Sequence, residues 1–303
     1  MKFRCNKNSI LNEISTAQGI ISSRNNLSIL SNVLLEAGNG SLCIKATDLK
    51  IGFETVIPVD VEEPGSTTVF CDKLLGVLRT FPEGDVIFTL EGDNFIIDSE
   101  YEDSNVKLKV IDSSKFPELI ETEQDKYFEI AQTDFLDMIN NTSFAVSNDE
   151  KKFFMNGVLL EKGEDTLNMV ATDGRRLSVI RKKTDIQNDF RNVIIPVKIF
   201  GIIKKLASGE GNMKIAVTEK CFFAEFDNNK IYTTLIDGVF PNYSKAIPTD
   251  QKFTAVISRN TFSNALSRVS VFAEQKSKKI FFNFSQDSLL ITSEESDIGE
   301  AKV

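Results

Sequence analysis

Residues 31–48 of the chain read SNVLLEAGNGSLCIKATD, and residues 156–173 read NGVLLEKGEDTLNMVATD. The two stretches lie 125 positions apart and share nine identical residues among 18, without a gap. A period of this length corresponds to a whole domain, because short solenoid repeats recur about every 20 to 50 residues. The repeat therefore predicts tandem copies of one domain.

The repeat extends beyond this stretch. The same offset relates Lys73 to Lys198, and a third copy begins at residues 280–292, IFFNFSQDSLLIT, which overlay residues 33–45 at an offset of 247. Three full copies would need about 375 residues, so we expect the chain of 303 residues to end inside its third copy. The expected domains are residues 1–120, 126–246 and 249–303, the last incomplete at its C-terminus.

Hydrophobic periodicity predicts the same elements in each copy. In the first copy, residues 2–6 alternate as a strand, and Ile10, Leu11, Ile14 and Ala17 then share one helical face. Further strands and helices follow, expected at residues 32–36, 41–47, 52–59, 66–70, 72–81 (helix), 85–90, 94–99 and 105–111, and in the second copy at 196–208 (helix). The predicted fold class is α+β, made of tandem copies with two helices and antiparallel sheets each.

Composition excludes several kinds of function. The chain has a net charge of −9 and no histidine, so it lacks the commonest general base and zinc ligand. Its four cysteines have no metal-ligand spacing, and we expect them to be reduced thiols in the cytoplasm; they are Cys5, Cys43, Cys71 and Cys221. No apolar run is long enough to span a bilayer. We expect neither a metal nor a cofactor.

Two helices carry cations at matching places. Lys73 and Arg79 lie opposite the apolar stripe of the helix expected at 72–81. Lys198 and Lys205 lie opposite the stripe of the helix at 196–208, whose expected buried residues are Ile199, Ile202, Ile203 and Leu206. Lysine and arginine are ordinary on any solvated helix face. Their recurrence in an acidic chain favours a second interpretation, a dedicated cationic surface.

Motifs for catalysis are missing from the sequence. There is no glycine-rich phosphate loop, nucleophile elbow or pair of metal ligands. The best polar cluster is ATDGRRL at residues 171–177, and its counterpart at residues 46–49 keeps the Thr-Asp pair. This favours a structural role for Asp173, bonding nearby backbone N–H groups. A site unique to the second copy should use residues that differ between the copies, which are Gly174, Arg175, Arg176 and Leu177.

The stretch ATDGRRL at 171–177, followed by FPNY at 240–243 in a triplicated α+β chain, resembles the β sliding clamps of bacterial DNA polymerase III. The resemblance covers the whole chain. It implies an arc or half-ring of domains, a head-to-tail homodimer that closes around duplex DNA, and a non-catalytic processivity factor of DNA replication. The implied partners are duplex DNA, the catalytic subunit of DNA polymerase III, other polymerases and the clamp loader, with no membrane.

The resemblance also implies three sets of site residues. The DNA-binding set is Arg24, Lys73, Arg79, Lys198, Lys204 and Lys205, with Lys151 and Lys152 as weaker candidates. The partner-peptide pocket is expected to consist of Met155, Thr172, Gly174, Arg175, Arg176, Leu177, Pro241, Lys245 and Ala246. The dimer interface is expected at Val106, Leu108, Val271 and Phe272. Ser277 stands where an apolar pocket residue is expected, and Arg175 where some relatives have another polar residue, so peptide preference is expected to differ.

Two other functions are kept as alternatives. One is an enzyme of nucleic-acid metabolism that uses Asp173, Arg175 and Arg176. The other is an interaction scaffold of the same fold that does not bind DNA. Without the resemblance, Met155 and Leu177 are interpreted as ordinary core residues, and Arg175 and Arg176 as surface residues. The residues assigned to the dimer interface are then the alternating residues of a strand and the apolar stripe of a helix.

Overall fold

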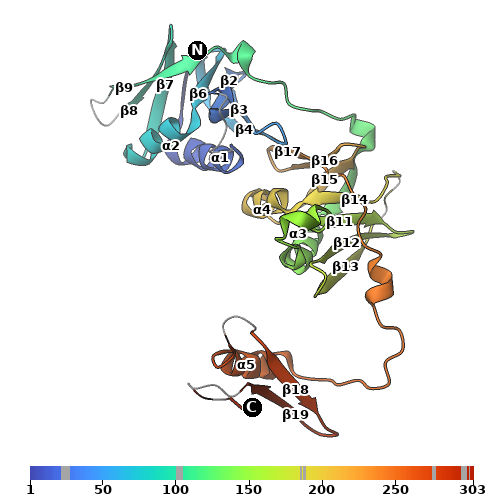
Figure 1. Cartoon of the computed structure of the whole chain (residues 1–303). Helices are drawn as coiled ribbons and strands as arrows, with labels where there is room; N and C mark the ends of the chain where they lie inside the picture. Colours follow the sequence, from blue (N-terminus) through green and yellow to red (C-terminus); the bar gives the residue numbers. More distant parts are fainter. Residues whose placement is uncertain are drawn as a thin grey trace. The chain divides into compact units, whose positions relative to one another are not determined.

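The structure is a computed structural model, and it describes residues 1–21, 28–99, 105–184, 186, 189–274, 278–294, 299 and 301–303. The described chain forms two compact units, Met1–Pro241 and Asn242–Val303 (Figure 1). Each unit is described by itself. Arg24 and Ser277 lie outside the described residues.

The first unit contains both full copies of the repeat. Module one consists of β1 (Lys2–Asn6), α1 (Lys7–Ile20), β2 (Asn32–Gly38), β3 (Ser41–Thr47), β4 (Ile51–Pro58), β5 (Asp60–Glu63), β6 (Gly65–Phe70), α2 (Cys71–Thr80), β7 (Asp85–Glu91), β8 (Asn94–Ser99) and β9 (Asn105–Ile111). Module two consists of β10 (Phe128–Ala131), α3 (Gln132–Thr142), β11 (Gly157–Lys162), β12 (Thr166–Thr172), β13 (Leu177–Lys183), β14 (Val193–Pro196), α4 (Val197–Leu206), β15 (Asn212–Val217), β16 (Cys221–Phe226) and β17 (Asn229–Thr234). The predicted α+β class, with two helices and antiparallel strands per copy, is confirmed.

One sheet runs through both modules. Its 13 strands lie in the order β10-β15-β16-β17-β4-β3-β2-β6-β9-β8-β7-β1-β5, and a separate sheet has the order β13-β12-β11-β14. The modules meet where β4 pairs with β17 in antiparallel register, with Phe53 opposite Ile231 and Gly52 opposite Tyr232. We call this pairing of β4 with β17 the seam. Because its hydrogen bonds continue the ladder, the two modules share one backbone framework.

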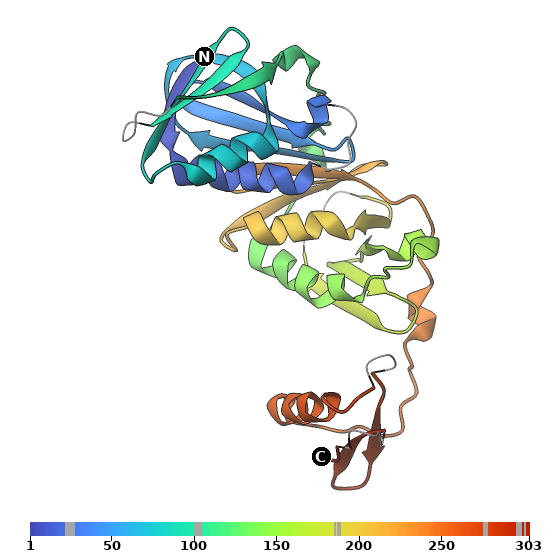
Figure 2. The same ribbon diagram turned by 60° about the vertical axis from the view of Figure 1, so that its left-hand side comes forward.

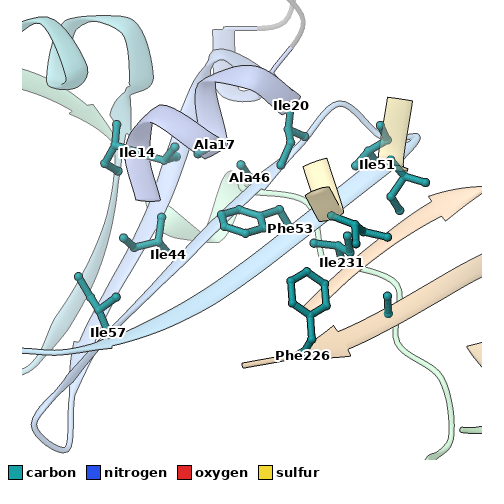
Figure 3. Close-up of a cluster of buried hydrophobic side chains, with 14 of the residues drawn as sticks. Ile14, Ala17, Ile20, Ile44, Ala46, Ile51, Phe53, Ile57, Phe226 and Ile231 are labelled. Carbon is teal, nitrogen blue, oxygen red and sulfur yellow. The ribbon is translucent and has the colours of Figure 1, made fainter. Parts of the chain in front are cut away.

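The hydrophobic core crosses the seam. Phe53 of β4 is buried together with Ile231 of β17 and Phe226 of β16 (Figure 3). On the module-one side, Ile14 and Ala17 of α1 pack into the same cluster. Each fully buried side chain of this size contributes about 1.5 to 3 kcal/mol, so the shared core stabilises the junction. The four helices lie along one side of this unit in the order α2, α1, α4, α3 (Figure 1 and Figure 2).

The buried face of α4 differs from the predicted one. The sequence predicts a stripe of Ile199, Ile202, Ile203 and Leu206, whereas the structure buries Ile199, Phe200 and Ile203 and leaves Ile202 and Leu206 half-buried. The reason is an aromatic contact: Phe200 lies with its ring centroid 6.3 Å from that of Phe135 in α3 and 6.4 Å from that of Phe222 in β16. The helix is turned so that the larger ring enters the core.

The second unit is small. It contains a short 3₁₀ turn, η6 (Tyr243–Ala246), the helix α5 (Arg259–Ser270) and a hairpin of β18 (Ile280–Phe284) and β19 (Leu289–Ser293). Ala265 and Val269 of α5 pack against Ile291 of β19 to form its core. In the part of the chain that the structure describes, no helix is long and apolar enough to cross a membrane.

Candidate functional site

The Thr-Asp pair of module one closes a turn between β3 and β4. The Thr47 hydroxyl donates to the carbonyl of Ile51 at 2.8 Å and accepts from the N–H of Leu49 at 3.0 Å. Oδ1 of Asp48 accepts from the N–H groups of Lys50 and Ile51 at 2.9 and 2.7 Å. These bonds satisfy the backbone donors of the turn, as the sequence predicts for an aspartate in this position.

The same bonds recur in module two, between β12 and β13. The Thr172 hydroxyl donates to the carbonyl of Arg176 at 2.7 Å and accepts from the N–H of Gly174 at 3.0 Å. Oδ1 of Asp173 accepts from the N–H groups of Arg175 and Arg176 at 2.9 and 3.0 Å. These donors lower the pKa of the Asp173 carboxyl, because their hydrogen bonds stabilise its ionised form. An acid held in this way is a structural element of the turn rather than a proton-transfer group.

The two turns differ in the second carboxylate oxygen. Oδ2 of Asp48 lies 3.3 Å from Nζ of Lys198 on α4, and the same ammonium donates to the carbonyl of Ile20, at the end of α1, at 3.1 Å. In module two, Oδ2 of Asp173 instead accepts from Nε of Arg176 at 3.1 Å. The module-one turn thus joins two modules, and the module-two turn orients an arginine.

Arg176 has a further support that the sequence does not reveal. Its Nη2 donates to the carbonyl of Phe144 at 2.7 Å, and its guanidinium carbon lies 5.5 Å from the centroid of the Phe144 ring. This is a cation–π geometry. Phe144 itself is 57% exposed. With Asp173 on one side and Phe144 on the other, Arg176 is held in one orientation while remaining exposed.

The structure brings together only part of the predicted peptide pocket. Gly174, Arg175 and Arg176 are exposed on one turn, at whose base Thr172 and Leu177 pair across β12 and β13. Met155 is half-buried at the end of the 3₁₀ segment η5 (Glu150–Met155). Pro241 ends the first unit, whereas Lys245 and Ala246 are exposed in the second unit.

Lys152 lies nearer to this turn than the sequence suggests. Its Nζ is 3.8 Å from the position that a Cβ on Gly174 would occupy. Gly174 has φ +87°, a left-handed conformation that favours glycine. The ammonium therefore adds positive charge beside Arg175 and Arg176. The sequence gives Lys152 only as a weak DNA-binding candidate, because nothing in its spacing shows proximity to a loop about twenty residues away.

The predicted DNA-binding cations are mostly free to meet a ligand. Lys73 and Arg79 on α2 and Lys204 and Lys205 on α4 are exposed. Lys198 is 45% exposed, and its ammonium is engaged with Asp48 and the end of α1. Its position therefore also serves the junction between modules.

The predicted dimer residues lie on two separate elements. Val106 and Leu108 on β9 are half-buried against the main core, while Lys107 between them is exposed. β9 pairs with β8 along residues 105–109, and with β6 only at residues 110–111. One side of residues 105–109 thus has no strand beside it in the described chain. In the second unit, Val271 is 74% exposed and Phe272 packs near Gly299.

No metal or catalytic centre is evident in the residues that the structure describes. They include no group of three or more His, Cys, Asp or Glu side chains that could hold a metal ion. Burial raises the pKa of the thiols of Cys5 and Cys71 to about 12 in each case, which makes them poor nucleophiles. The fold and these sites define a class of protein: a chain of repeated α+β modules whose polar groups support binding surfaces.

Comparison with known proteins narrows this class to a family. Family models described as the N-terminal, central and C-terminal domains of the DNA polymerase III beta subunit match residues 1–120, 129–242 and 244–302. The "Beta sliding clamp" of Treponema pallidum is 38% identical over 307 residues, covering 100% of this chain and 83% of that protein. That of Borreliella burgdorferi is 33% identical over 308 residues, covering 97% and 79%.

Solved structures agree with the sequence comparison. A Pseudomonas aeruginosa DnaN sliding clamp bound to griselimycin matches with a TM-score of 0.92 and 27% identity, over 100% of this chain and 83% of that one. A Borrelia burgdorferi DNA polymerase III subunit beta in complex with a natural product matches with a TM-score of 0.89 and 31% identity, over 100% and 82%. The chain belongs to the bacterial β sliding clamp family. It is a DNA sliding clamp of DNA replication, a non-catalytic subunit whose partners are DNA and polymerase.

Proposed function

We propose that the protein acts in the cytoplasm as a head-to-tail homodimer, a ring that encloses duplex DNA and tethers the replicative polymerase to it. Its domains are residues 1–120, 126–246 and 249–303, as the repeat suggests. A heterologous contact that closes by rotation gives a ring with a defined number of subunits. Because enclosure holds the DNA, tight phosphate contacts are unnecessary, and each one would add salt-dependent affinity that opposes sliding.

The observation that carries this proposal is that the helices α1 to α4 all lie along one side of the first unit (Figure 2). The exposed cations of two modules stand on helices along one side of a continuous sheet, in a chain of net charge −9. We assign DNA contact to this helical side, through Lys73, Arg79, Lys198, Lys204 and Lys205. Arg24 lies outside the described residues, and its role in DNA contact is proposed from the resemblance alone. Lys73, Arg79, Lys204 and Lys205 are exposed and available, which supports the assignment.

The open side of β9 supports the assigned dimer interface. Residues 105–109 present backbone groups that another strand can pair with. Val106 and Leu108 on this strand, and Val271 and Phe272 in the second unit, are assigned to the contact between subunits. A strand paired across two chains would repeat, between subunits, the kind of junction that β4 and β17 make within one chain.

The partner site is assigned to the module-two turn. Met155, Leu177 and Pro241 would supply apolar contacts to a short linear peptide of the polymerase III catalytic subunit, of other polymerases or of the clamp loader. Ala246 belongs to the second unit and is proposed from the resemblance alone. Thr172, Gly174, Arg175 and Arg176 would meet its polar groups, and Lys245 of the second unit is proposed, like Ala246, from the resemblance alone. The fixed orientation of Arg176 supports this assignment, since an exposed guanidinium held by two partners is pre-organised for a ligand.

Enclosure is tested with nicked circular DNA. The protein, loaded by its clamp loader, should stay on circles through gel filtration and leave when a restriction enzyme linearises them. Equal retention on circular and linear DNA would refute topological holding, and retention on neither would favour the scaffold alternative.

The cationic side is tested by removing three charges. Changing Lys73, Lys204 and Lys205 to Ala should lower the salt dependence of DNA binding, by about 0.9 in log–log slope for each lost phosphate contact. The matched control removes three exposed lysines elsewhere and should leave the slope unchanged; these are Lys115, Lys220 and Lys252. Equal effects of the two triple variants would contradict the assignment.

The partner site is tested with a fluorescent peptide from the clamp-binding segment of a polymerase III catalytic subunit. Arg176→Ala combined with Leu177→Ala should weaken binding at least tenfold, about 1.4 kcal/mol, yet leave ring closure intact. Lys50→Ala is the control, because Lys50 holds the place of Arg175 in the module-one turn. Unchanged affinity of the double variant would refute the pocket.

A further inference from the structure

At the seam, the ring of Tyr232 fits closely over Gly52, which has no side chain. A Cβ placed on Gly52 of β4 would overlap the ring of Tyr232, the residue opposite it on β17. Tyr232 is only 5% exposed and packs against Phe223, with ring centroids 5.8 Å apart. The ring therefore occupies the space that Gly52 leaves, and any other residue at position 52 would displace it.

A row of alternating charges crosses the seam beside this fit. The residues paired in register, strand by strand from β10 to β3, are Glu129, Lys214, Glu225, Lys230, Glu54 and Lys45. At the seam itself, Nζ of Lys230 lies 3.5 Å from Glu54, and Nζ of Lys45 lies 3.6 Å from the same carboxylate. Opposite charges facing each other across strands favour this register, and like charges would oppose it.

The repeat supplies a second strand that could compete for β4. With the offset of 125, β9 corresponds to β17: Asn105 corresponds to Lys230, and Lys107 to Tyr232. On β4, β9 would place Asn105 opposite Glu54, which removes the ion pair, and a lysine stem opposite Gly52 instead of a ring. Since β9 has an open side along residues 105–109, a subunit that has not yet dimerised through β9 can offer it to β4 of another chain.

The repeat also supplies a second acceptor. β13 corresponds to β4, with Leu177 at the place of Gly52 and Val179 at the place of Glu54. β13 pairs only with β12 in the described chain, so its other side is open as well. A strand with the sequence of β17 would meet a leucine side chain under Tyr232 there and no carboxylate for Lys230. Of the three pairings compared, only β4 with β17 is matched in both shape and charge.

We infer that Gly52 and Glu54 form a selective acceptor on β4, which admits β17 through Tyr232 and Lys230 and rejects β9. Selectivity of this kind prevents a heterologous strand contact from propagating between chains, which would give open polymers instead of closed assemblies. Lys198 does not distinguish β17 from β9, because Lys73 holds the same place in module one and could make the same ion pair. The inference goes beyond the proposed clamp function and does not depend on DNA or peptide binding.

The inference is tested by transferring residues between strands in the full chain. The first variant gives β17 the residues of β9, Lys230→Asn with Tyr232→Lys. Amide hydrogen exchange at β4 should then rise at least tenfold. The second variant adds Asn105→Lys and Lys107→Tyr, so that β9 carries the matched residues. Analytical ultracentrifugation should then show assemblies that grow with concentration and exceed those of the first variant.

Two controls keep the test decisive. Lys214→Asn removes the same charge from β15, two strands away from β17, and should leave exchange at β4 unchanged. Asn105→Lys with Lys107→Tyr alone should form no assemblies larger than those of the parent, because β17 still occupies β4. Any effect of these substitutions on the dimer contact assigned to β9 is measured in this control as well. If circular dichroism shows that the first variant is unfolded, Lys230→Asn alone replaces it, since Lys230 is exposed. Parental exchange at β4, or no added assembly in the second variant, would overturn the inference.

Discussion

The two Thr-Asp turns have the same backbone hydrogen bonds but serve different purposes. In module one, Asp48 binds Lys198 of the other module, and its turn is followed by Gly52 at the seam. In module two, Asp173 binds Arg176 of its own turn, and Leu177 stands in the place of Gly52. The comparison teaches that a duplicated turn keeps its local bonds while the residues beside them decide whether it joins two modules or orients an exposed arginine.

The largest effect is expected at the glycine that distinguishes the two turns. Gly52→Ala should lower the free energy of unfolding of the first unit by about 3 kcal/mol, because the new methyl group overpacks against Tyr232. Chemical denaturation measures this change. Gly76→Ala is the control: apart from its chain neighbours and its own helix backbone, no atom lies within 4 Å of its Cβ position, and in the helix α2 alanine should be slightly stabilising. Equal effects at both glycines would contradict the close fit.

The two aspartates should separate stability from binding. Asp48→Ala removes turn bonds and the partner of Lys198, so we expect a loss of about 2 kcal/mol in unfolding free energy. Asp173→Ala should cost less stability, but it should weaken peptide binding by freeing Arg176. Denaturation and fluorescence titration of both variants test this. A loss of peptide affinity in Asp48→Ala equal to that in Asp173→Ala would show that the turns are not specialised.

The lowered pKa of Asp173 determines how the stability of the module-two turn depends on pH. Because the folded-state pKa of Asp173 lies below the ordinary 3.8, its contribution to stability is complete above that value and is lost as the pH falls below it. The difference in unfolding free energy between the parent and Asp173→Asn should therefore stay constant from about pH 7 to about pH 5. A difference that already declines in this range would contradict the assigned bonds.

The smallest effect is expected at the position that is strained in only one turn. Leu49 has φ +71° and corresponds to Gly174 of module two. Since Leu49 is 54% exposed, Leu49→Gly relieves the left-handed backbone with little loss of packing and should stabilise the chain by about 0.5 kcal/mol. Thermal unfolding measures the shift. A clear destabilisation would show that the Leu49 side chain has a packing role.

The sequence predicts most of the elements because their signals are local. The strands 2–6, 41–47, 94–99 and 105–111 agree with the observed bounds, and the Thr-Asp turn role follows from the repeat alone. β5 was not predicted, because its sequence DVEE is short and acidic, and its pairing with β1 gives it strand geometry. Pairing partners distant in the sequence leave no local pattern to read.

The candidate site was predicted only in part, for the same reason. The differences between the copies pointed to Gly174, Arg175, Arg176 and Leu177. The support of Arg176 by Phe144, and of Asp48 by Lys198, joins residues far apart in the chain, so periodicity and spacing could not reveal them. Arg24 and Ser277 lie outside the described residues, and their predicted roles stay predictions.

The fit of Tyr232 on Gly52 has a consequence for the history of the chain. Tandem duplication begins with interchangeable copies, and a chimera in which module two replaced module one would then be harmless. With Leu177 in place of Gly52, the leucine side chain of such a chimera would now occupy the space of the Tyr232 ring and prevent β17 from pairing. The order of the copies has become fixed, and recombination between the two halves of the gene should be selected against.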